Sequence, residues 1–126
     1  MKDRTLLSVA SLLAIVFALV HLADDVVRGF APGGPQVLFA VVFAAVWLYA
    51  AFVLADRRFG QIVILLASIM GFWVSTLHMR GAGMVGGRIA HSDGMLLWVC
   101  MLLGLGVSST FAAMLAARAL WGFRRG

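Results

Sequence analysis

Residues 6–22, with the sequence LLSVASLLAIVFALVHL, decide the class of this protein because they contain no Asp, Glu, Lys or Arg. A helix that spans a membrane needs about 20 predominantly apolar residues, and three further apolar runs follow at 37–55, 62–77 and 95–120. Run length and the lack of frequent turn signals favour helices over strands. We therefore predict an all-α fold, an integral membrane four-helix bundle forming a single domain, with spans at about 5–28, 36–55, 61–79 and 92–120.

The composition of the whole chain agrees with this class. Of 126 residues, 63% are hydrophobic and 12% are charged, whereas soluble domains have about 45–50% apolar and about 25% charged residues. So few charges cannot cover a water-facing surface, and so high a hydrophobic content excludes a disordered chain. The single cysteine, Cys100, excludes an intramolecular disulfide and a CxxC redox pair.

Positive side chains are divided unevenly between the two sides of the predicted bundle. Seven fall on the side of the termini and three on the other. The first group is Lys2, Arg4, Arg57, Arg58, Arg118, Arg124 and Arg125, and the second is Arg28, Arg80 and Arg88. The positive-inside rule then places both termini in the cytoplasm of a multi-pass protein of the cell membrane. The net charge of +5 is thus a topology signal and not a nucleic-acid footprint, and the expected partner is the lipid bilayer.

With this topology, all three histidines and three of the five acidic residues lie on the extracytoplasmic side. They are His21, His78, His91, Asp24, Asp25 and Asp93. Three of the ionisable residues in the first span, Asp24, Asp25 and Arg28, follow His21 at i+3, i+4 and i+7, which is one face of a helix. Ionisable residues inside a membrane are costly and usually face the bundle interior, so they are candidates for function.

Imidazole and carboxylate side chains together suggest a transition-metal site. We expect His21, Asp25, His78 and His91 to be the ligands of iron, copper or zinc. A b-type haem held by two of the histidines is a second form of this hypothesis. Asp24, Arg28, Arg80, Arg88 and Asp93 are the candidates for positioning the ligands or for binding an anion. Either site would serve redox or metal-handling chemistry, and the sequence does not decide whether the protein is an enzyme.

Three alternatives stay open at this point. The first helix could end at Leu22, which would leave Asp24 and Asp25 in a wet loop. Alternatively, an Asp–Arg pair could act as a structural lock in a non-catalytic accessory or assembly subunit of a larger membrane complex. A small-solute transporter is the least favoured class, because a transport path needs polar groups and residues 37–55 contain no charge.

Small residues in the fourth run predict a helix-packing face. Gly104 and Ser108 form a small-xxx-small pair, and Gly106 lies between them. This face could pack within the bundle, in a homo-oligomer or against another subunit. We interpret Trp98 as a packing or lipid-contacting residue, although a buried indole N–H needs a hydrogen-bond acceptor.

Overall fold

The computed structural model describes residues 2–31, 33–79 and 93–122. It contains four helices, α1 (Lys2–Val27), α2 (Pro35–Phe52), α3 (Arg58–Met79) and α5 (Met95–Gly122), and no strand within these residues. Each helix is long and apolar enough to cross a membrane. The expected all-α fold with four such helices is confirmed, whereas membrane insertion and the cytoplasmic location of the termini stay predictions.

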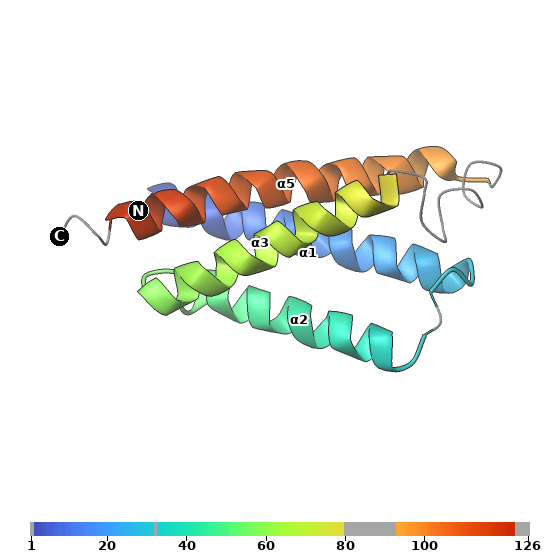
Figure 1. Cartoon of the computed structure of the whole chain (residues 1–126), viewed down its shortest axis with the longest axis horizontal. Coiled ribbons are helices and arrows are strands. Elements are labelled where there is room, and N and C mark those ends of the chain that lie inside the picture. The colour runs from blue at the N-terminus through green and yellow to red at the C-terminus, as the bar shows by residue number, and fades with distance from the viewer. Residues whose placement is uncertain (1, 32, 80–92, 123–126) are drawn as a thin grey trace.

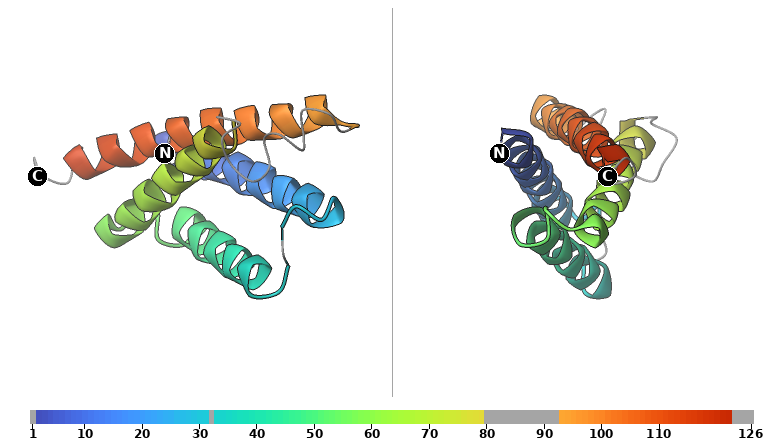
Figure 2. Two further views of the ribbon diagram at one scale, coloured as in Figure 1. Left: turned by 45° about the vertical axis from the view of Figure 1, so that its right-hand side comes forward. Right: turned by 90° about the vertical axis from the view of Figure 1, so that its left-hand side faces the viewer.

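The helices run alternately up and down, so both termini lie toward one end of the bundle (Figure 1). At the other end, α1 and α3 finish and α5 begins. The most extensive packing joins α5 to α3 and to α1, while α2 lies against α1 and α3 at the side of the bundle (Figure 2). This arrangement brings His21, near the end of α1, to the same end as His78, near the end of α3.

The end of α1 keeps both adjacent carboxylates on a helix. Gly29 has a φ of 72°, and the N–H groups of Phe30 and Ala31 both donate to the carbonyl of Asp25, at 2.8 and 3.1 Å. A glycine with positive φ and such closing hydrogen bonds is a common helix C-cap. Because α1 continues to Val27, the alternative in which the helix ends at Leu22 is wrong.

Small residues allow the helices to approach closely. A Cβ added at Gly104 of α5 would lie 2.7 Å from Phe17 Cζ of α1, and one added at Gly106 would lie 2.8 Å from Ser75 Oγ of α3. Ser108 donates a hydrogen bond of 2.5 Å to the carbonyl of Gly104 within α5. Both glycines of the expected packing face therefore lie at contacts inside this bundle.

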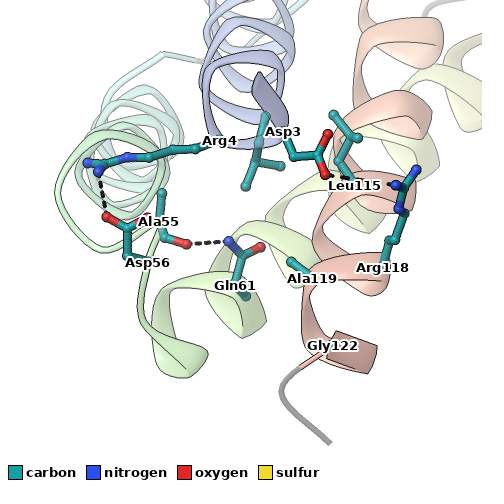
Figure 3. Close-up of a pocket in the computed structure, with 10 residues that line it drawn as sticks. Asp3, Arg4, Ala55, Asp56, Gln61, Leu115, Arg118, Ala119 and Gly122 are labelled. Atoms are coloured by element: carbon teal, nitrogen blue, oxygen red, sulfur yellow. Dashed lines mark hydrogen bonds and ion pairs between the residues drawn. The ribbon is translucent and has the colours of Figure 1, made fainter. Parts of the chain in front are cut away.

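The end of the bundle near the termini is held by paired charges (Figure 3). Arg4 lies 2.5 Å from Asp56, and Arg118 lies 3.8 Å from Asp3. These residues line a pocket of about 430 Å³ together with Gln61, which donates to the carbonyl of Ala55. The side chains of both ion pairs are at least half exposed. Exposed ion pairs stabilise a protein by at most about 1 kcal/mol.

Candidate metal centre

Three of the four expected metal ligands come together at the end of the bundle away from the termini. One ligand atom each from His21, Asp25 and His78 lies within 4.8 Å of the other two. His21 Nε2 is 3.3 Å from Asp25 Oδ2. The two imidazole rings meet edge to face, with centroids 5.0 Å apart and an interplanar angle of 90°. Two imidazole nitrogens and one carboxylate oxygen thus lie close enough together to hold one metal ion.

Burial makes this cluster unusual for ionisable residues. His21 is 4% exposed and Asp25 is 6% exposed. Their positions follow from the sequence of α1, because residues four apart lie above one another on a helix. His78 comes from α3, and the rotation of α3 against α1 places its ring beside that of His21.

The backbone fixes the tautomer of His78. Its Nδ1 lies 2.8 Å from the carbonyl oxygen of Val74, one turn earlier in α3. A carbonyl can only accept a hydrogen bond, so this contact places a proton on Nδ1, and the lone pair of a neutral ring is then on Nε2. A histidine that binds a metal usually donates its other N–H to a carbonyl or carboxylate in this way.

His21 has no such partner among the described residues. Both ring nitrogens are buried, and neither makes a hydrogen bond there. The contact of 3.3 Å with Asp25 falls within ion-pair distance but does not have hydrogen-bond geometry. A buried polar group left without a partner costs about 1–3 kcal/mol. Within the described residues, the buried ring therefore has hydrogen-bonding or ligand capacity that no hydrogen bond uses.

Trp98 of α5 completes the surroundings of the carboxylate. Its Nε1 donates a hydrogen bond of 3.1 Å to Asp25 Oδ1, while Oδ2 faces His21. The indole is 4% exposed, and its ring centroid lies 5.6 Å from that of His21. Sequence reasoning missed this role. The available signal was the need of a buried indole N–H for an acceptor.

Asp24 and Arg28 form a separate pair beside the cluster. Arg28 Nε donates to Asp24 Oδ2 at 2.8 Å, and its Nη1 donates to the backbone carbonyl of Asp93 at 2.5 Å. Arg28 thus connects α1 to the residues before α5. The contact of Arg28 with Asp93 involves the backbone carbonyl of Asp93 and not its carboxylate. The other expected site residues, His91, Arg80 and Arg88, lie outside the described residues.

A cavity of about 280 Å³ opens beside the cluster, between α1, α2 and α3, with Leu105 of α5 as part of its wall. Its lining is apolar apart from His21, Asp25, His78 and the indole of Trp47. Trp47 Nε1 is buried and makes no hydrogen bond to the described residues. The candidate ligands therefore stand at the edge of an apolar chamber.

The arrangement of these three side chains could hold a metal ion. Two imidazoles and a carboxylate are a common ligand set for catalytic zinc and for non-haem iron, and three protein ligands leave positions for a further ligand. The apolar chamber would lower the local dielectric constant around such an ion.

No protein family matches this chain, and neither does any curated protein or solved structure.

Proposed function

We propose that this protein binds one transition-metal ion within the membrane, through His21, Asp25 and His78, at the extracytoplasmic end of a four-helix bundle. The observation that carries the proposal is the state of His21. Both of its nitrogens are buried without a hydrogen bond in the described chain, beside two further donor groups within 4.8 Å. A metal ion would satisfy the ring and offset the charge of Asp25.

The donor set supports iron(II) or zinc. Imidazole and carboxylate suit both ions, whereas copper(I) favours sulfur ligands. A bare ion is better supported than a b-type haem. A haem between two axial histidines needs a gap for the porphyrin between the two rings, and the rings of His21 and His78 are in edge-to-face contact. His91 stays a candidate fourth ligand from the sequence.

With only the three described ligands, the ion would be reactive rather than purely structural. Structural zinc sites are usually closed by four protein ligands, and catalytic sites keep an open position. Trp98 would orient Asp25, and the carbonyl of Val74 would orient His78, as ligands of the ion. A bound ion would act as a Lewis acid or redox centre toward an oxygen ligand at an open position.

A structural lock is the second candidate, and one observation favours it. Trp98 joins α5 to Asp25 of α1, and Arg28 joins α1 to the carbonyl of Asp93. These contacts connect helix ends without any ion, as an accessory subunit of a membrane complex would require. A lock gives no reason, however, why neither nitrogen of His21 makes a hydrogen bond to the described residues.

Elemental analysis by mass spectrometry decides between the two candidates. The protein is purified in detergent without a chelator, as wild type, as His21→Ala and His78→Ala, and as Val20→Ala, which truncates an exposed neighbour of His21. We expect near-stoichiometric iron or zinc in the wild type and in Val20→Ala, and loss of the metal from both histidine variants. A folded wild type without metal, or equal metal in all four proteins, contradicts the proposal and leaves the lock.

A further inference from the structure

We propose that the cavity beside the cluster binds the chain of a single-chain lipid carboxylate, with its carboxylate group at the His21–Asp25–His78 cluster. This inference rests on the proposed metal site and adds the class of molecule that occupies its open position. It is carried by three features of the cavity: its walls, its size, and the charge at its polar end.

The walls of the cavity select an apolar body. Ile15, Ala18, Phe43 and Val74 lie around it, and its polar side chains are confined to the cluster and to Trp47. At its rim, Phe39 is 64% exposed on α2 and Met70 is 45% exposed on α3. If the helices span the bilayer as their length and composition allow, this rim faces lipid, and a ligand would enter sideways from the membrane.

The size of the cavity limits the occupant to a slender molecule. A volume of about 280 Å³ holds about nine groups the size of a water or a methylene, at about 30 Å³ each. One alkyl chain of medium length fits this volume. Two such chains exceed this volume.

The charge of the cluster selects the head group. With the proposed divalent ion bound, one Asp25 carboxylate and two neutral imidazoles would leave the cluster with one positive charge. Asp24 does not reduce it, because Arg28 already neutralises that carboxylate at 2.8 Å. A net charge buried in an apolar environment is costly unless it is paired. One carboxylate from the ligand makes the site neutral, whereas an alcohol does not.

Photo-crosslinking tests the inference on the full chain in phosphatidylcholine nanodiscs. The probes are an eight-carbon fatty acid that carries a diazirine in its chain and the matched fatty alcohol. The variants are Ala40→Phe and the smaller Ala40→Leu, which fill the cavity, and Ala45→Phe on the same helix, which is exposed and outside the lining. The metal content of each sample is measured in parallel.

We expect the fatty acid to label peptides around Phe43 and Leu105 in the metal-loaded wild type and in Ala45→Phe. Labelling by the acid should fall about tenfold in Ala40→Phe and by less in Ala40→Leu, because the new side chains fill the cavity. In the wild type, labelling by the alcohol should be about tenfold weaker than by the acid, which corresponds to the loss of one charge-assisted contact. Equal labelling of the wild type by the acid and the alcohol overturns the inference, and so does equal labelling of Ala40→Phe and Ala45→Phe by the acid. If the wild type is loaded with metal in either case, the proposed function stands. A wild type that binds no metal overturns the proposed function by a separate measurement.

Discussion

Trp98 Nε1 of α5 donates to Asp25 Oδ1 of α1 at 3.1 Å, across 73 positions of sequence. The hydrogen bond occupies one oxygen of a buried carboxylate and leaves the other directed at His21, 3.3 Å away. A carboxylate free to rotate would present its two oxygens equally. The indole therefore selects which oxygen takes part in the candidate metal centre, and this relationship gives the first prediction.

Substitution of Trp98 by phenylalanine should weaken metal binding without unfolding the bundle. The ring is retained and the N–H is lost, so Asp25 loses the group that orients it. Loss of such an orienting partner typically lowers metal affinity by about 10–100-fold. Competition with a chelator of known affinity measures the effect. The matched control is Trp73→Phe on α3, where the indole is 59% exposed; equal affinities in the two variants would show that the N–H has no such role.

The two adjacent carboxylates of α1 should differ in their effect on metal content. We expect Asp25→Asn to lose most of the metal, because it removes the proposed anionic ligand of the cluster. Asp24→Asn should retain it, because the Asp24 carboxylate is paired with Arg28 at 2.8 Å and lies outside the cluster. Metal analysis of both purified proteins gives the comparison. The reverse ranking would mean that Asp24 and not Asp25 is the ligand.

Substitution of Gly94 by alanine should destabilise the end of the bundle that carries the cluster. Gly94 has a φ of 81°, and an added Cβ would lie 2.5 Å from Arg28 Nη2. The control is Gly29→Ala, where φ is 72° and no atom lies within 4 Å of the added Cβ. Both variants carry backbone strain of about 1–2 kcal/mol, so the difference between them reports the displacement of Arg28.

We expect Gly94→Ala to lower the free energy of unfolding by up to about 1 kcal/mol more than Gly29→Ala does, because Arg28 must move and weaken its contacts with Asp24 and Asp93. Thermal unfolding in detergent, followed by circular dichroism, measures both. Identical stabilities would show that Arg28 can move away without loss, and that its contact with Asp93 does not stabilise this end.

Enlarging Gly104 should loosen the contact between α1 and α5. In Gly104→Leu the new side chain would meet the ring of Phe17, whose nearest atom lies 2.7 Å from the Cβ position. Overpacking of this kind costs about 1–3 kcal/mol. Gly122→Leu on the same helix is the control, because nothing lies within 4 Å of its Cβ position. A stable Gly104→Leu protein that loses a co-purifying partner would assign this face to another subunit instead.

The sequence alone determined the helices and one pair within the site. Run length and hydropathy are local properties, so residues 6–22 already indicate a helix that can span a membrane. The i, i+4 spacing of His21 and Asp25 likewise places both on one face, because the helical period is fixed by backbone hydrogen bonding. Neither conclusion depends on how the helices pack against one another.

Only the tertiary structure decided which other residues reach that pair. Whether His78 and Trp98 contact the His21–Asp25 pair depends on the rotation and register of α3 and α5. Close packing around small residues such as Gly104 and Gly106 sets both. The division between Asp24 and Asp25 has the same origin. Adjacent residues project about 100° apart around a helix, so packing turns one carboxylate toward His21 and leaves the other to Arg28. Sequence spacing permits either choice, and contacts between helices select one.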